Sequence, residues 1–275
     1  MRVLDIDSRQ GIRLVSRYAE LSNTRAFTLF DHTNSARVTG RHDVTDTTSY
    51  INGVYTTGEP MTKTAVTLLA LGDIMLDRGV RMAMDRHGVG YPFKKIERFL
   101  AGSDVLIANL EGPITDNASR SFSPNNLTFT FSPSVVSTLK RLGFSIFSLA
   151  NNHTLNFGAK GLSQTKKYLA KKNINSFGDP KNVKDISKIV TVRGMRIGFV
   201  GFHGLVRGGQ TAIIEEIKKI RGIADTIIVY PHWGNEYKPF FSSSQQNDAH
   251  SFIDAGADII IGAHPHVIQP MEVYK

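Results

Sequence analysis

Five apolar runs in the larger part of the chain each end at a short group of polar side chains. The runs cover residues 66–71, 105–108, 146–150, 227–230 and 259–261. Their length and their content of Val, Ile and Leu predict buried strands. In an open α/β sheet, ligands bind outside the carboxyl ends of the strands. If these runs are parallel strands, the five polar groups therefore meet at one rim of the sheet.

The segments between these runs have the periodicity of amphipathic helices. They predict helices over residues 78–86, 93–100, 133–142, 159–171, 212–221 and 244–255. Two more strands are expected at 188–192 and 196–201, with a turn at Arg193 and Gly194 between them. Alternating strands and helices predict an α/β fold with a largely parallel sheet that helices cover on both faces.

Residues 1–62 differ in composition from the rest of the chain. They are rich in Thr, Ser, Asn, Asp and Arg, and only short apolar stretches interrupt them. We therefore expect an N-terminal extension of short strands or partial disorder, followed by one main domain over residues 63–275. The predicted strand at 259–261 leaves little chain to complete a sheet before Lys275. We expect this domain to lack some C-terminal strands.

The composition narrows the classes of function. The chain has 275 residues, no cysteine and a net charge of +9. The lack of cysteine excludes disulfides and thiolate ligands, and the positive charge favours anionic partners. Five lysines between residues 160 and 172 are interpreted as the solvated face of a helix. Because basic and aromatic residues are not interleaved as in a nucleic-acid module, no nucleic-acid partner is expected. No apolar run approaches the roughly 18 residues of a transmembrane helix, and no signal-peptide core stands at the start of the chain.

Histidines end two of the apolar runs. His232 follows one buried run, and His264 and His266 follow another in a His-Pro-His sequence. Imidazole is a common ligand of transition metals. Taken alone, the His-Pro-His sequence is also compatible with two histidines that simply lie on the surface or pack in the core. Because the two groups follow independent strands, their joint placement favours a metal site.

Carboxylate and amide side chains end the other runs. Asp73 either ligates a metal or caps the next helix. Glu111 precedes a Gly-Pro pair that turns the chain, so its carboxylate is expected at the rim, where it can bridge two cations. Asn152 offers an amide oxygen beside His153, although an Asn-rich turn explains this segment equally well. A purely structural role would have to apply at all five strand ends independently. We therefore predict a metal centre.

Five motifs occur in order between residues 65 and 275. They are Leu-Gly-Asp-Ile-Met-Leu-Asp-Arg from residue 71, Asn-Leu-Glu-Gly-Pro from 109, Leu-Ala-Asn-Asn-His from 149, His-Trp-Gly-Asn-Glu-Tyr from 232 and Gly-Ala-His-Pro-His-Val from 262. Together they resemble the motifs of the bacterial capsule-synthesis CapA family, of the poly-γ-glutamate type. That family is related to the calcineurin-like metallophosphatases. Residues 1–62 lie outside the resemblance.

The resemblance implies a metallophosphatase-like four-layer α/β/β/α sandwich with two divalent metal ions (Mn, Fe or Zn). His153 is implied to be a non-ligand that protonates a leaving group or stabilises developing charge. The implied metal ligands are Asp73 and His266 at one ion, Glu111 between the two, and Asn152, His232 and His264 at the other.

The resemblance also suggests residues that contact a substrate. They are Arg78, Asn151, Trp233 and Glu236. Trp233 is the only tryptophan of the chain, and it either forms an apolar wall of the pocket or packs in the core.

The sequence departs from the family pattern in places that bear on the site. Met75 stands where the wider metallophosphatase pattern has a histidine, so the first ion would lose a ligand. Asn156 stands where the family usually has an aspartate, so a carboxylate that orients an imidazole would be absent. The closing Ser-Leu-Gly-Asn-Phe region of the family does not occur in this chain.

The leading hypothesis is a CapA-like protein in the synthesis or processing of an anionic capsule polymer, acting by metal-dependent hydrolysis or transfer at a phosphoester or amide bond. A generic metallophosphoesterase that acts on small phosphoesters shares the same residues. The third hypothesis is a non-catalytic, polymer-binding component of a membrane-bound capsule synthesis or export complex. The resemblance implies a location in the cell envelope, outside the cytoplasm. A Ser-His-Asp hydrolase and a P-loop enzyme are disfavoured, because neither signature motif occurs.

Overall fold

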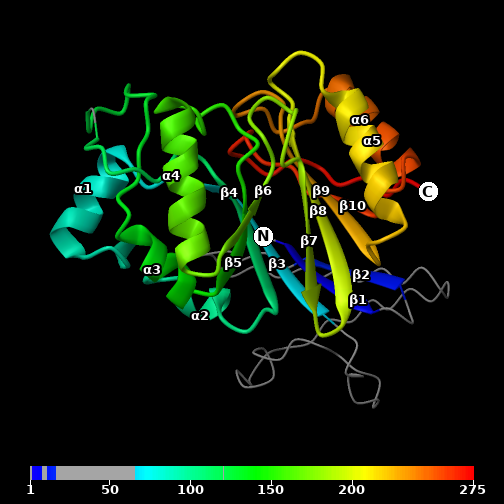
Figure 1. The fold of residues 1–275 in the computed structure, drawn as a ribbon, viewed down its shortest axis with the longest axis horizontal. Helices are drawn as coiled ribbons and strands as arrows, with labels where there is room; N and C mark the ends of the chain where they lie inside the picture. The colour runs from blue at the N-terminus through cyan, green and yellow to red at the C-terminus, as the bar shows by residue number, and fades with distance from the viewer. Residues whose placement is uncertain (1, 8–10, 17–65, 120) are drawn as a thin grey trace.

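Strands form two sheets in the computed structural model, which describes residues 2–7, 11–16, 66–119 and 121–275 (Figure 1). The first sheet has the order β2-β1-β3-β4-β5-β6, and the second has the order β10-β9-β8-β7. Strands β3 to β6 are parallel, whereas β1 and β2 join the β3 edge as antiparallel strands. In the second sheet β8, β9 and β10 are parallel, and β7 is antiparallel to β8.

Five of the strands, β3, β4, β5, β9 and β10, coincide with the five apolar runs of the sequence. The first sheet contains β1 (Arg2–Asp7), β2 (Gly11–Ser16), β3 (Val66–Ile74), β4 (Val105–Leu110), β5 (Phe144–Ser148) and β6 (Asn175–Phe177). The second contains β7 (Ser187–Val192), β8 (Met195–His203), β9 (Thr226–His232) and β10 (Ile259–Ile260).

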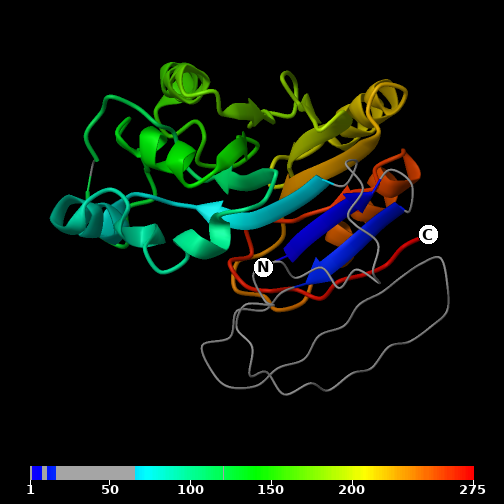
Figure 2. The same ribbon diagram turned by 90° about the horizontal axis from the view of Figure 1, so that it is seen from below.

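Helices lie on the outer side of each sheet, as the two views in Figures 1 and 2 show. The first sheet is covered by α1 (Arg78–His87), the 3-10 turn η1 (Tyr91–Phe93), α2 (Glu97–Leu100), α3 (Val135–Arg141) and α4 (Gly158–Lys171). The second sheet is covered by α5 (Gln210–Arg221) and α6 (Ser243–Asp254). None of the helices in the described part of the chain is both long enough and apolar enough to cross a membrane.

Three buried apolar clusters separate these layers. On β3, Leu69 packs against the helices of the first sheet, whereas Leu68 and Ala70 pack between the two sheets. On β8, Phe199 faces the first sheet and Val200 faces the cluster under α5 and α6. Alternate side chains of a strand point to opposite faces, so each sheet is buried on both sides. The arrangement is the predicted four-layer α/β/β/α sandwich.

The periodicity argument alone expected one sheet with helices on both faces, and this was wrong. The structure has two sheets packed against each other, with helices on the outer faces only. All six residues of β4 are buried. A fully apolar run indicates that both faces of a strand are covered, but not whether a helix or a second sheet covers them.

Other elements differ from expectation in detail. The helix predicted over residues 93–100 is divided into η1 and α2, with Pro92 in the first turn of η1. Strand β6 was not predicted, because three residues are too few to show a pattern. The predicted turn is confirmed, since Arg193 and Gly194 have φ values of 51° and 86° between β7 and β8. These are the positive φ values that a tight hairpin turn requires.

Two glycines let the sheets approach at the carboxyl ends of their strands. Gly178 follows β6 with a φ of 85°, and Gly201 lies near the end of β8. A Cβ atom on Gly201 would lie 2.6 Å from the Cα atom of Gly178, so neither position has room for a larger side chain. This close contact brings the loops of the two sheets together.

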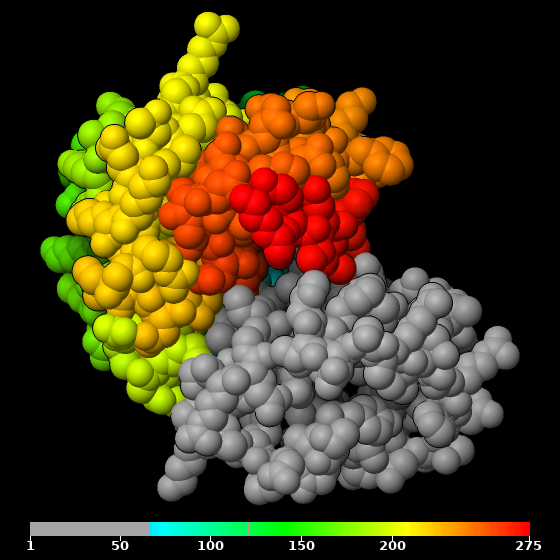
Figure 3. Space-filling model, turned by 90° about the vertical axis from the view of Figure 1, so that its right-hand side faces the viewer, coloured from blue at the N-terminus to red at the C-terminus, as the bar shows by residue number. Residues whose placement is uncertain are grey.

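The two ends of the described chain lie on different layers. Strand β1 pairs with β3 at the edge of the first sheet. Most of the predicted extension, and its boundary with the main domain after residue 62, lies outside the described residues. Residues 267–275 lie along α6, where Gln246 donates to Glu272 (3.1 Å) and His250 stacks on Tyr274 with ring centroids 3.8 Å apart (Figure 3).

Candidate metal centre

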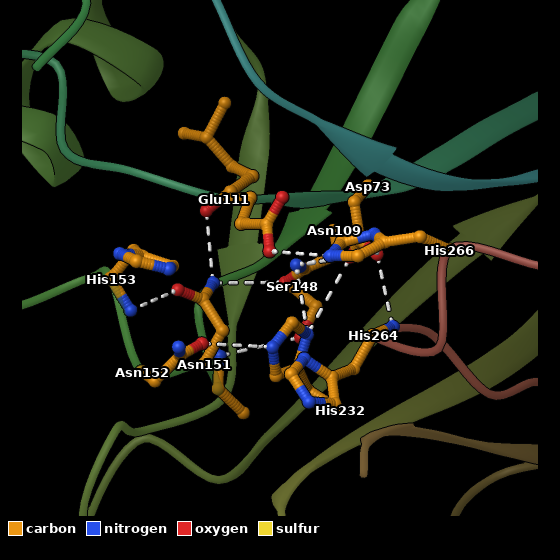
Figure 4. Close-up of polar contacts among 12 residues, drawn as sticks. Asp73, Asn109, Glu111, Ser148, Asn151, Asn152, His153, His232, His264 and His266 are labelled. Atoms are coloured by element: carbon orange, nitrogen blue, oxygen red, sulfur yellow. Dashed lines mark hydrogen bonds and ion pairs between the residues drawn. The ribbon is translucent and has the colours of Figure 1, made fainter. Parts of the chain in front are cut away.

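The side chains predicted as metal ligands lie together where the carboxyl ends of the two sheets meet (Figure 4). Asp73 ends β3, Glu111 follows β4, and Asn152 follows β5. His232 is the last residue of β9, and it pairs by an isolated bridge with Ala263, next to His264. The parallel direction of these strands is what places side chains more than 190 residues apart in sequence within hydrogen-bonding distance.

Asp73 connects the two sheets. Its Oδ1 atom accepts from Asn109 Nδ2 (2.7 Å) and lies 3.5 Å from His232 Nδ1. Its Oδ2 atom accepts from the backbone N–H of His264 (2.9 Å) and lies 3.2 Å from His266 Nδ1. Burial on its own would raise the pKa of Asp73, but the hydrogen bonds with His232 and His266 outweigh it and lower the pKa well below the usual range. Asp73 is therefore a permanent negative charge in the site.

Glu111 is a buried carboxyl group without a strong cationic partner. Its side chain is 7% exposed, and His266 Nε2, 3.8 Å away, is its ion-pair partner among the described residues. Burial and the negative charge of Asp73 raise the pKa of Glu111 to about 8. Two carboxyl groups held close together in a buried site repel each other when both are ionised. A cation between them would relieve that repulsion.

His264 offers a lone pair that the protein does not use. Its Nδ1 atom is buried and has no hydrogen-bond partner among the described residues. Burial, together with the positive charge of nearby His232, lowers the pKa of His264 to about 4. The ring is therefore neutral at ordinary pH, which is the state that binds a metal.

The donor atoms fall into overlapping sets that suit divalent ions. In each set, one atom from every residue lies within 4.8 Å of the others. The sets are Asp73, Glu111 and His266; Glu111, His232 and His264; and Glu236, His264 and His266. Glu111 belongs to both of the first two sets, as a bridging carboxylate does in two-metal sites. Carboxylate and imidazole donors suit Zn, Fe and Mn. The residues present therefore fit the implied metal ions.

Amide side chains hold this arrangement in place. Asn151 is fully buried, and its amide donates to Asn109 Oδ1 and to the carbonyl of Leu110, both at 2.9 Å. Its Oδ1 atom accepts from the backbone N–H of His153 (3.0 Å), which shapes the turn after β5. Asn152 then points its Oδ1 atom at His232 Nε2 (2.9 Å). Asn151 thus lies under the site, and its predicted contact with substrate remains a prediction.

His153 lies at the edge of the site against Phe129. The two ring centroids are 4.2 Å apart, and His153 Nδ1 lies 3.2 Å from Asn156 Oδ1. The same Oδ1 atom accepts from the backbone N–H of Phe129 (2.7 Å), so it faces His153 as an acceptor. Asn156 therefore orients the ring through a neutral amide oxygen in place of a carboxylate. Burial lowers the pKa of His153.

The residues predicted to contact substrate lie in different environments. The guanidinium of Arg78 lies 4.9 Å from the centroid of Phe129 and donates to the carbonyl of Pro124 (2.6 Å). Glu236 is half-exposed at the rim, 4.0 Å from His266 Nε2. Trp233 is 8% exposed and packs in the cluster under α5 and α6. The packing of Trp233 agrees with the core interpretation, and its substrate contact remains a prediction.

Met75 does not reach the donor sets. Its side chain packs against the apolar cluster under α1 to α4, and its sulfur lies 3.2 Å from the backbone N–H of Asp77. The first donor set is therefore built from Asp73, Glu111 and His266 without a contribution from this position.

The backbone around the site is strained. Arg78, Tyr237, His264 and His266 have φ values of 54°, 59°, 92° and 56°. Positive φ is uncommon for residues other than glycine and costs roughly 1–3 kcal/mol for each residue. Such conformations persist where the surrounding structure fixes them, and they cluster at functional sites.

Sequence reasoning missed two residues of the site. Asn109 lies within a quoted motif, but its contacts with Asp73, His232 and Asn151 were not anticipated. His203 ends β8 with its ring centroid 6.2 Å from that of His232. Its Nδ1 atom bonds the carbonyl of Pro180 (2.7 Å), and its Nε2 atom is buried without a partner in the described structure. The rule that polar residues at strand ends form the site would have found it, had the run at 196–201 been included.

Comparisons with known proteins identify the family of the chain. A family model described as "Bacterial capsule synthesis protein PGA_cap" matches residues 67–275. The capsule biosynthesis protein CapA of Bacillus anthracis is 33% identical over 232 residues, which cover 76% of this chain and 56% of that protein. The PGA biosynthesis protein CapA of Bacillus subtilis (strain 168) is 30% identical over 222 residues, covering 74% and 58%. This chain thus spans little more than half the length of these relatives. The crystal structure of a hypothetical protein from Thermus thermophilus matches with a TM-score of 0.45 at 20% identity, covering 73% of this chain and 68% of that one.

Proposed function

The chain belongs to the bacterial capsule synthesis protein PGA_cap family, and from that premise we propose that it acts in the biosynthesis or processing of an anionic capsule polymer of the poly-γ-glutamate type. We propose that it does so by metal-dependent hydrolysis or transfer. The observation that carries the proposal is the pair of donor sets that share the buried carboxyl group of Glu111. The chain's net charge of +9 suits a polymer with many carboxylates.

Two divalent ions, Mn, Fe or Zn, would be held by residues from both sheets. When bound, they would polarise the attacked group and activate water. Glu111 would contact both ions, with its proton displaced. The ligands of one ion would be Asp73, Glu111 and His266, and those of the other would be Glu111, Asn152, His232 and His264.

His153 is the proposed proton donor to the leaving group. The Asn156 amide oxygen holds its Nδ1 atom, which leaves Nε2 as the atom that transfers the proton. Because burial lowers the pKa of His153, its protonated form gives up a proton more readily than an ordinary imidazolium. Arg78, stacked on Phe129, is placed to bind a carboxylate or phosphate group of the substrate. Glu236 at the rim is a second candidate for substrate contact.

The proposed location and partners rest on the same family membership. We propose that the protein works in the cell envelope, outside the cytoplasm, in contact with a membrane-bound capsule synthesis complex. A role that is limited to binding the polymer is the competing function, because Met75 adds no ligand to the first donor set. Binding without turnover would favour that role.

The test is cleavage of poly-γ-glutamate by the purified chain, supplied with Mn, Zn or Fe. We expect turnover that the His264→Ala variant lacks, because this substitution removes one ligand and its buried lone pair. The matched control is His250→Ala on α6, remote from the strand ends, which should keep full turnover. Equal turnover and equal metal content in wild type and His264→Ala would contradict the assignment. Activity on a small phosphodiester alone would instead favour a general phosphoesterase.

A further inference from the structure

A large share of the net positive charge of the chain lies in one segment. Residues 158–186 contain seven lysines and two aspartates, and no arginine or glutamate. They therefore carry five of the nine net positive charges of the chain in about a tenth of its length. This segment comprises α4 and β6 of the first sheet and the loop that leads from β6 to β7.

Helix α4 presents a continuous row of lysines to solvent. Its buried face is formed by Gly161, Thr165 and Leu169. Lys160, Lys167 and Lys171 are exposed. At 3.6 residues per turn, positions separated by seven and eleven residues lie on the same face of a helix, here over roughly 16 Å of its length. The exposed lysines therefore form a row along the outer side of α4.

The row begins next to the candidate metal centre. Strands β5 and β6 are parallel, so α4 between them must run back from the carboxyl ends of the strands. The helix starts at Gly158, two residues after Asn156, which holds the His153 ring. Figure 1 shows α4 on the outer face of its sheet, starting from the end where the strand loops gather.

The loop after β6 adds to this surface. Lys166 of α4 pairs with Asp185 of the loop (2.7 Å), so the loop is tied to the helix. Asn182 accepts from the backbone N–H of His203 (2.8 Å) and donates to its carbonyl (3.0 Å), so the loop is also fixed to the end of β8. Lys181 and Lys184 are exposed on this anchored loop. We name Lys160, Lys167, Lys171, Lys181 and Lys184 the lysine track.

The lysines of the track have no ion-pair partners among the described residues, although the carboxylates of Asp116 and Asp185 lie against α4. On α5, which covers the second sheet, Lys219 pairs with Glu216 (3.0 Å) and Arg221 pairs with Asp258 (2.7 Å). Among the described residues, no lysine of the track forms an ion pair, and α4 contains no acidic residue. A row of like charges that outnumber the nearby carboxylates raises the local potential and attracts a polyanion.

We infer that the lysine track binds a stretch of an extended polycarboxylate chain whose reacting bond lies at the metal centre. The inference rests on the proposed function for its choice of polymer. Each exposed ion pair is weak and is screened by salt, so the track acts through several contacts at once. The track would therefore strengthen binding of a long polymer. A substrate too short to extend beyond the metal centre would not contact the track.

The test measures binding of dye-labelled long poly-γ-glutamate, and of the γ-glutamyl dipeptide, by fluorescence anisotropy. The triple variant Lys160→Gln, Lys167→Gln and Lys171→Gln should weaken binding of the long polymer about tenfold at low salt, given the size of exposed ion pairs. The dipeptide should bind equally to the variant and to wild type. Raising the salt concentration should reduce the difference between the two proteins.

The control removes the same charge elsewhere. Lys94→Gln, Lys95→Gln and Lys218→Gln change three exposed lysines away from α4, and binding should stay within about twofold of wild type. Equal losses in both triple variants would overturn the inference, because only net charge would then matter. Tighter, track-dependent binding of single-stranded DNA or anionic vesicles would also overturn it. If the polymer binds through the track but no metal supports its cleavage, the proposed function fails while the track stands.

Discussion

The two sheets bring different chemistry to the site. The first sheet supplies oxygen atoms, from Asp73, Glu111 and Asn152. The second supplies the imidazoles of His232, His264 and His266. The second sheet also supplies the carboxylate of Glu236, which follows β9. The two donor sets that share Glu111, however, combine residues of both sheets, so they form only where the two sheets meet.

Several contacts of the site cross the boundary between the two sheets. Both oxygens of Asp73 bond groups of the second sheet, and Asn152 bonds His232. The strained backbone at His264 and His266 lies on the same boundary. The contacts that form the site are therefore also contacts that hold the two sheets together. Metal binding should then stabilise the whole domain.

The largest expected effect comes from removing the one residue shared by the two proposed ion sites. Glu111→Gln should abolish retention of both ions and lower turnover on the order of 10³-fold or more. The same change should leave the metal-free protein equally or more stable, because it removes a buried carboxyl group held beside Asp73. Metal analysis and thermal unfolding of the same sample would measure both. An equivalent change on the surface, Glu215→Gln on α5, should do neither. Retention of two ions by Glu111→Gln would contradict the claim that both ions depend on Glu111.

Metal addition should stabilise both sheets together. At metal concentrations about 100-fold above the dissociation constant, one site adds about 2.7 kcal/mol. For a chain of this size the melting temperature should rise by about 5–10 °C. Circular dichroism with and without a chelator measures the shift. The gain should be largely lost in His264→Ala and kept in His250→Ala. A shift confined to a part of the unfolding transition would mean that the sheets unfold independently.

The pH dependence of the metal-free protein should report Glu111. Its pKa is about 8 in the folded protein, above the value of 4.5 for the free side chain. The folded state therefore holds a proton that the unfolded state loses, and this contribution to stability is full below about pH 4.5. It decreases as the pH rises and is lost by about pH 8. Denaturant unfolding from pH 5 to 8 should show a decrease in wild type that Glu111→Gln lacks. Parallel curves for the two proteins would contradict the raised pKa.

The smallest expected effect concerns a residue of the first sheet alone. Asn156→Asp should raise the pKa of His153, because a carboxylate then faces its Nδ1 atom. The pH profile of turnover should move to higher pH, with a change in rate of about tenfold or less. Metal content should not change, since neither residue belongs to a donor set. A shift in metal content would show that this contact supports the centre.

The sequence allowed prediction of where the candidate ligands lie better than of the side chains that hold them in place. Strand ends are visible as apolar runs that stop, and so Asp73, His232 and His264 could be placed at one rim. Asn109 could not be recognised, because its role depends on which side chains of neighbouring strands lie beside it. His203 depends on the contact between the loop after β6 and β8.

Prediction of the fold from the sequence was limited in the same way. Alternation of apolar residues located most strands and helices but could not show that a second sheet covers the first. The motif resemblance supplied that layer order. Lysines on α4 looked like an ordinary solvated face, because a sequence does not show that cations elsewhere are paired across elements, as Arg221 is with Asp258.

Metal stoichiometry of the folded chain tests the joint site most directly. The protein would be incubated with Mn, Zn or Fe, desalted and measured by elemental analysis beside Glu111→Gln. The structure predicts about two ions per wild-type chain and none in the variant, because Glu111 belongs to both donor sets. Folded wild-type protein that retains no ion would contradict the central claim that the two sheets together build a metal centre.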